Sequence, residues 1–142
     1  MASEENCDSL RGHSSDEILD IVSLPAVRAG TEFRLGVTIT ATRRAAISVV
    51  NPSDSETASV KIQLRGVNRD DNAALIEIPP LSRISRFLLE IVVPDDFPAD
   101  PTRWLFRGTA TITSNIPIAV GALDFILPDG KLVYVPVARL EN

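Results

Sequence analysis

The chain has 142 residues, of which 44% are hydrophobic, 14 are Lys or Arg and 19 are Asp or Glu, giving a net charge of −5. A chain of this length is expected to form one domain that buries its own core without a metal ion or a disulfide. The negative charge argues against a nucleic-acid partner, because a phosphate-binding surface needs an excess of Lys and Arg. No apolar stretch approaches the roughly 20 residues of a membrane span, so no membrane insertion is expected.

The negative charge is concentrated at the N-terminus, while the rest of the chain carries equal numbers of acidic and basic residues. We expect residues 1–17 to be a flexible acidic tail and residues 18–142 to be a single domain. Cys7 and His13 are two lone potential ligands in this tail, so no zinc site is expected. The first residues also lack the basic start and apolar run of a secretory signal.

Strand patterns separated by turn residues follow along the domain. The clearest lies at 57–65, where apolar and polar residues alternate, which predicts one buried and one wet face. Strands are expected at 18–24, 31–40, 45–50, 57–65, 74–78, 107–114, 118–127 and 131–138.

Turn residues suggest how neighbouring strands are connected. Asn51 and Pro52 predict a turn that makes 45–50 and 57–65 an antiparallel pair. A turn is also expected at Asn115-Ile116-Pro117, and a hairpin turn at Pro128-Asp129-Gly130.

One segment departs from the strand pattern and predicts a short helix near 82–91. Its apolar residues recur at intervals of three or four: Leu81, Ile84, Leu88 and Ile91. Ser82 is expected to cap this helix and Pro94 to stop it. Together, seven or eight strands and one short helix predict an all-β antiparallel sandwich.

The residues do not indicate an enzyme. With a single His in the tail, no Ser-His-Asp or Cys-His arrangement can form in the domain. Acidic pairs can act on sugars or bind calcium, but we favour plain turns, because Asp is a preferred turn residue. The acidic clusters are Asp70, Asp71, Asp95, Asp96 and Asp100. We therefore predict no catalytic residue, no cofactor and no metal site.

Two aromatic residues are weak candidates for ligand stacking. Trp104 precedes a strand and is more simply explained as an anchor that closes the core, and Tyr134 is the other candidate. The basic pairs Arg43-Arg44 and Arg83/Arg86 are expected to be solvated or to pair with nearby acids.

The apolar residues after the tail suggest that copies of the chain assemble. Residues 16–27 could add as a strand to the open edge of a neighbouring copy, and repeated addition would build a filament. The expected interface residues are Ile18, Leu19, Ile21, Val22 and Leu24.

From residue 45 onward, the order of short motifs resembles a known module. The motifs are AISVVNP at 46–52, IPP at 78–80, Arg83, Arg86, Phe87 and Glu90, FRGT at 106–109, ITSNIPIAV at 112–120 and VPV at 135–137. Over about residues 45–138 this set resembles a poorly characterised immunoglobulin-like β-sandwich module of bacterial exported and cell-surface proteins.

The resemblance implies an immunoglobulin-like sandwich with a structural or adhesive role outside the cell and no catalytic residues to carry over. We expect a non-catalytic cell-surface module whose partners are proteins or copies of itself. The alternatives are a filament subunit joined through residues 16–27 and, after it, a calcium- or glycan-binding module.

Overall fold

The computed structural model describes residues 28–66, 69–94 and 97–140, and these form an antiparallel β structure. The strands are β1 (Gly30–Thr40), β2 (Arg43–Val50), β3 (Ala58–Gly66), β4 (Arg69–Ile78), β5 (Arg83–Phe87), β6 (Leu105–Ile126), β7 (Lys131–Tyr134) and β8 (Val137–Arg139). Two three-residue 3-10 helices, η2 (Leu88–Glu90) and η3 (Pro101–Arg103), lie between β5 and β6. The expected all-β antiparallel sandwich is confirmed, whereas the predicted tail and the strand at 18–24 lie outside the described residues.

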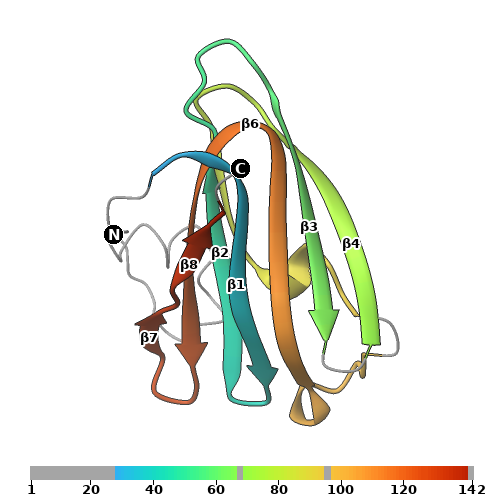
Figure 1. Ribbon diagram of the computed structural model, residues 1–142. Helices are drawn as coiled ribbons and strands as arrows, with labels where there is room; N and C mark the ends of the chain where they lie inside the picture. Colours follow the sequence, from blue (N-terminus) through green and yellow to red (C-terminus); the bar gives the residue numbers. More distant parts are fainter. Residues whose placement is uncertain (1–27, 67–68, 95–96, 141–142) are drawn as a thin grey trace.

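The 22-residue strand β6 belongs to both sheets. Up to Ile118 it pairs with β1 and β3, giving a sheet of order β4-β3-β6-β1-β8. From Ala119 onward it pairs with β2 and β7, giving a second sheet of order β5-β2-β6-β7. Figure 1 shows β6 bending over one end of the molecule between its two halves.

The chain turns at Asn115-Ile116-Pro117 as predicted, but within the single long strand β6 and not between two separate strands. These residues have no partner in the registers with β1, β2 and β3, so they form the bend between the two sheets. Proline lacks a backbone N–H and fits where no ladder bond is needed. The hairpin turn at Pro128-Asp129-Gly130 is confirmed, since Ile126 pairs with Lys131.

The predicted pairing of 45–50 with 57–65 is wrong, because β2 and β3 lie in different sheets. The connection after β2 crosses from one sheet to the other instead of turning back. Asn51 holds this crossing, since its Nδ2 donates to the carbonyl oxygens of Glu56 at 2.8 Å and Ile78 at 2.9 Å.

The expected helix near 82–91 is mostly strand. Residues Arg83–Phe87 form β5, which pairs with β2 from Ala46 to Val50, and only Leu88–Glu90 is helical, as a 3-10 turn. Pairing along the sheet edge replaces the helical hydrogen bonds that the spacing favours, a tertiary override of a local pattern. Ser82 does not cap a helix, because its Oγ donates to Pro80 O at 3.2 Å.

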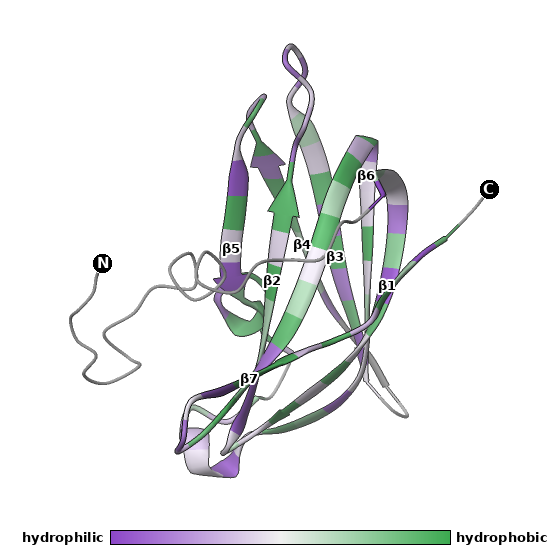
Figure 2. Ribbon diagram, turned by 90° about the vertical axis from the view of Figure 1, so that its left-hand side faces the viewer, coloured by the Kyte–Doolittle hydropathy of each residue, from purple (hydrophilic) through white to green (hydrophobic). Residues whose placement is uncertain are grey.

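The inward residues of both sheets form one core. Figure 2 shows hydrophobic and hydrophilic residues alternating along several strands, as expected for strands with one buried face. The large fully buried side chains include Phe33, Ile39, Ile47, Ile62, Leu64, Ile78, Leu88, Ile112, Ile118 and Leu123. Val120 to Leu123 are all buried, so this part of β6 is covered on both faces. None of the helices in the described ranges is long and apolar enough to cross a membrane.

Candidate functional site

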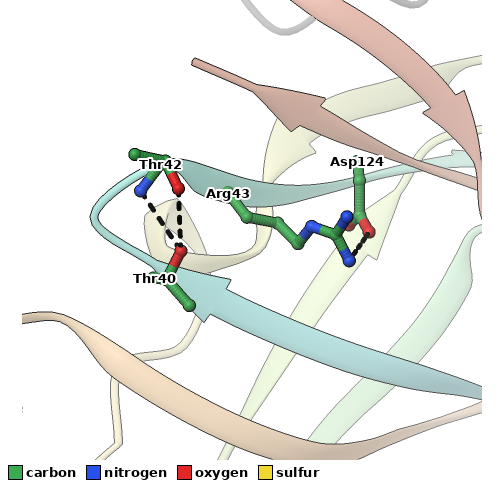
Figure 3. Close-up of polar contacts among 4 residues, drawn as sticks. All are labelled: Thr40, Thr42, Arg43 and Asp124. Carbon is green, nitrogen blue, oxygen red and sulfur yellow. Dashed lines mark hydrogen bonds and ion pairs between the residues drawn. The ribbon is translucent and has the colours of Figure 1, made fainter. Parts of the chain in front are cut away.

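The turn between β1 and β2 sets the direction of two consecutive arginines. Thr42 N donates to Thr40 Oγ1 at 3.2 Å, and the two hydroxyl oxygens lie 3.4 Å apart (Figure 3). β2 begins at the next residue. Because successive residues of a strand point to opposite faces, Arg43 and Arg44 diverge.

Arg43 behaves as the sequence predicts, as an ion-pair partner of a nearby acid. Its Nη1 lies 3.7 Å from Asp124 Oδ2, with the Asp124 side chain 14% exposed and that of Arg43 42% exposed (Figure 3). Burial raises the pKa of Asp124, and the charge of Arg43 lowers it in part. The pair joins β2 to β6 and lines neither the apolar cavity beside Trp104 nor the polar depression on the other sheet.

Arg44 differs from its expected role as a solvated charge, because it packs on an aromatic ring. Its guanidinium carbon lies 4.4 Å from the centroid of the Trp104 ring, a cation–π distance, and its Nη2 donates to Ala41 O at 3.2 Å. β5 pairs with β2 only from Ala46 onward, so Arg44 lies beyond the end of the neighbouring strand. This position lets the side chain reach the loop that carries the tryptophan.

Trp104 is held in place by the segment between η2 and β6. Its indole Nε1 donates to Pro98 O at 2.8 Å, and its ring centroid lies 5.8 Å from that of Phe97. Asp100 begins the preceding 3-10 helix, accepting hydrogen bonds from Thr102 N at 3.0 Å and Thr102 Oγ1 at 2.8 Å. Asp100 is thus a turn residue, as the sequence predicts.

A cavity of about 380 Å³ lies beside Trp104 and Arg44. Its remaining lining is mainly apolar and comes from β1, β2, the end of β5 and the segment that follows: Ile39, Ala45, Phe87, Leu89, Glu90, Val93, Phe97, Pro98 and Ala99. Its volume and apolar walls are those of a small-molecule site, for which about 300–1,000 Å³ is usual.

Two charged side chains line this cavity. Burial lowers the pKa of Arg44, although a guanidinium stays protonated in proteins. The Arg44 Nε is buried without a hydrogen-bond partner, and no described carboxylate lies within ion-pair distance of this arginine. The other charge, Glu90, accepts a hydrogen bond at Oε1 from Phe87 N at 2.9 Å.

A second, polar depression of about 400 Å³ lies on the sheet that contains β1, β3 and the first half of β6. Thr111 pairs with Arg34 on one side and with Gln63 on the other, and Arg65 pairs with Thr109. The strand period predicts wet threonines on β6, but the arginines beside them depend on the strand order.

The remaining predicted positions do not join the apolar cavity. Tyr134 is 46% exposed on β7 and does not line it. Residues 16–27, Cys7 and His13 lie outside the described residues, as do Asp95 and Asp96. In the part of the chain that the structure describes, no group of three or more His, Cys, Asp or Glu side chains is arranged to hold a metal ion.

The sequence reasoning identified Trp104 but missed its partner Arg44 and the other cavity residues. A usable signal was the clustering of Phe97, Trp104 and three prolines in the stretch 94–104, which lacks the alternation of a regular strand. The arginine gave no such signal, because it is brought to the tryptophan only by the fold.

Comparison with known proteins shows a likeness in fold. No family model matches the sequence, and none of the curated proteins matches it. A crystal structure of Thermotoga maritima 1070 matches with a TM-score of 0.61 and 13% identity, covering 79% of this chain and 95% of that one. The Anabaena sensory rhodopsin transducer matches with a TM-score of 0.47 and 17% identity, covering 68% and 83%. The likeness to the Thermotoga protein supports an all-β, sandwich-like fold and nothing more specific.

Proposed function

We propose that this chain is a non-catalytic β-sandwich module that acts by binding. The structural or adhesive role, the immunoglobulin-like family and the place outside the cell rest on the ordered motifs in residues 45–138. The observation that favours a binding role is the apolar cavity of about 380 Å³ beside Trp104, into which a partner's apolar group would fit. Such a cavity exposes aromatic surface that a purely structural spacer would bury.

The charged groups of the cavity support binding rather than catalysis. The Arg44 guanidinium is stacked on Trp104, and the Glu90 carboxylate accepts a hydrogen bond from the backbone of Phe87. Arginine does not exchange protons at neutral pH, so Arg44 cannot act as the general acid that would have to accompany Glu90 as a general base. Both side chains are suited to orient a ligand.

A neutral apolar probe tests this proposal. Trp104 is the sole tryptophan of the sequence, so its fluorescence reports on the cavity wall. Octanol should change this fluorescence with a saturable dependence on concentration and should raise the melting temperature, because a ligand of the folded state stabilises it.

A matched pair of variants shows where the probe binds. Ala99 is exposed and lines the cavity, so Ala99→Phe should obstruct the cavity and weaken octanol binding. Ala138 is exposed on β8 and does not line it, so Ala138→Phe should leave binding unchanged. Absence of saturable binding to the unmodified chain, or equal binding to both variants, would contradict the proposal.

Assembly by strand addition is the second candidate function, and the open edge at β4 favours it. β4 pairs with β3 over Arg69–Ile78 and with no other described strand, and Leu75 on it is 68% exposed. An unpaired edge of this length accepts an added strand. Light scattering of the full chain should then show mass growing with concentration, and Ile21→Lys in the expected donor segment should stop the growth. A constant monomer mass would exclude assembly.

A further inference from the structure

We propose that the cavity beside Trp104 is a site for a small amphiphile with an apolar chain and one carboxylate, held by Arg44. This inference rests on the binding role proposed above and specifies the ligand class. It follows from the shape of the cavity, from the Arg44 Nε that has no hydrogen-bond acceptor, and from the position of the Arg44 guanidinium beside the apolar walls.

The cavity has room for an aliphatic chain. An apolar protein cavity of about 150 Å³ holds one benzene molecule, and the cavity here measures about 380 Å³. Phe87, Val93 and Phe97 contribute apolar surface to its wall, and Val93 is 49% exposed. Covering this surface with an alkyl chain removes apolar area from water, which favours binding.

The cation supplies the preference for a carboxylate. Arg44 is half-buried, its Nη2 donates to Ala41 O, and its Nε has no acceptor. A desolvated charge is costly unless an opposite charge and hydrogen bonds offset the cost. A ligand carboxylate at the guanidinium provides both, because hydrogen bonds between two charged groups are the stronger kind.

The second charge of the cavity does not compete for Arg44. Glu90 accepts a hydrogen bond at Oε1 from Phe87 N across the start of η2, and no ion pair joins it to Arg44. The negative charge of Glu90 would, however, attract a cationic ligand to the same cavity. The sign of the ligand charge therefore has to be measured.

Three probes with the same alkyl chain separate the effect of the head-group charge on affinity from that of the apolar chain: octanoate, octanol and octylammonium. Each is titrated into the full chain at neutral pH while Trp104 fluorescence is followed, and the affinities are checked by calorimetry. We expect octanoate to bind about tenfold more tightly than octanol, which is the expected effect of one charge-assisted hydrogen bond. Octylammonium should bind more weakly than octanol, because its charge repels that of Arg44.

Variants show whether the arginine causes this preference. Arg44→Gln should reduce the octanoate affinity to that of octanol, whereas Arg44→Lys should keep a preference because it keeps the charge. Arg103 is exposed, next to Trp104 in sequence, and does not line the cavity, so Arg103→Gln should change none of the affinities. Circular dichroism of each variant confirms that it is folded before its titration is interpreted.

The outcomes distinguish failure of the carboxylate preference from failure of the binding role on which it rests. Equal binding of octanoate and octanol would overturn the carboxylate preference and leave the binding role intact. Tightest binding by octylammonium would also overturn it and would assign the ligand charge to Glu90. Tighter binding by the tripeptide Ala-Ala-Leu with a free carboxyl end than by octanoate would identify a peptide terminus instead of an amphiphile. If none of the probes binds, both proposals fail.

Discussion

Replacing Asn51 should destabilise the sandwich more than replacing any exposed asparagine. This side chain is fully buried, and its Nδ2 donates to the carbonyl oxygens of Glu56 at 2.8 Å, Ile78 at 2.9 Å and Pro79 at 3.2 Å. Its Oδ1 accepts a hydrogen bond from Ser53 N at 3.0 Å. The one amide therefore joins the loop after β2, in one sheet, to the end of β4 in the other.

The magnitude follows from the bonds that would be lost. A hydrogen bond contributes about 0.5–1.5 kcal/mol net, and a buried polar group left without a partner costs about 1–3 kcal/mol. Because some of the freed carbonyl groups can reach water, Asn51→Ala should lower the free energy of unfolding by about 3 kcal/mol. For a domain of this size, that loss lowers the melting temperature by roughly 6–12 °C.

Asn51→Asp keeps the shape of the side chain and replaces the donor with an oxygen. At neutral pH a carboxylate would face the carbonyl oxygens of Ile78 and Pro79, so the loss should exceed that of Asn51→Ala. This repulsion raises the pKa of the introduced carboxyl above its unfolded value of about 3.9. The folded state then binds the proton more tightly, so the deficit of Asn51→Asp shrinks as the pH falls through the raised pKa. The deficit of Asn51→Ala should not change in this way.

Urea denaturation followed by circular dichroism measures these differences. Asn72→Ala is the control, because Asn72 Nδ2 also donates to a backbone carbonyl, that of Val93 at 2.9 Å, but in an exposed setting. It should cost less than about 1 kcal/mol. The reasoning is refuted if Asn51→Ala costs no more than Asn72→Ala, or if Asn51→Asp matches Asn51→Ala at every pH.

Two further pairs of variants test the close packing of β6 and the ion pair beside it. Gly108→Ala would place a methyl group against the carbonyl oxygen of Arg65 on β3, and should cost at least about 2 kcal/mol in urea denaturation. Gly36→Ala, with nothing within 4 Å of the added methyl, should be neutral or stabilising by about 0.5 kcal/mol, and a larger loss there than at Gly108 would contradict the packing. Burial raises the pKa of Asp124, so the folded state holds its proton more tightly, and stability should fall as the pH rises from about 3.9 through the raised pKa. Asp124→Asn should remove this fall and Arg43→Gln should steepen it, because the cation that lowers the pKa is lost; an unchanged pH profile in Asp124→Asn would contradict the assignment.

Most strands can be placed from local sequence patterns alone. Alternation of apolar and polar residues depends only on near neighbours, and the strands expected at 31–40, 45–50 and 57–65 agree with β1, β2 and β3 within a few residues. Turn chemistry is equally local, which is why Pro79 marks the end of β4 and Gly130, with φ of 74°, fits the hairpin turn before β7.

Local patterns do not show which strands pair or which side chains line the cavity, because both depend on residues that are distant in sequence. Ser85 Oγ donates to Ser48 Oγ at 3.1 Å inside the contact of β5 with β2, and this pairing makes a strand of a segment whose spacing favours a helix. In the same way, Asn51 is a typical turn residue by its local sequence, whereas in the fold its side chain hydrogen-bonds across the two sheets. Arg44 and Trp104 are far apart in sequence and meet in the fold. Their contact and the partial burial of the Arg44 guanidinium define the candidate site. Local patterns report the preferences of a few adjacent residues, whereas pairing, burial and charge compensation arise between distant ones.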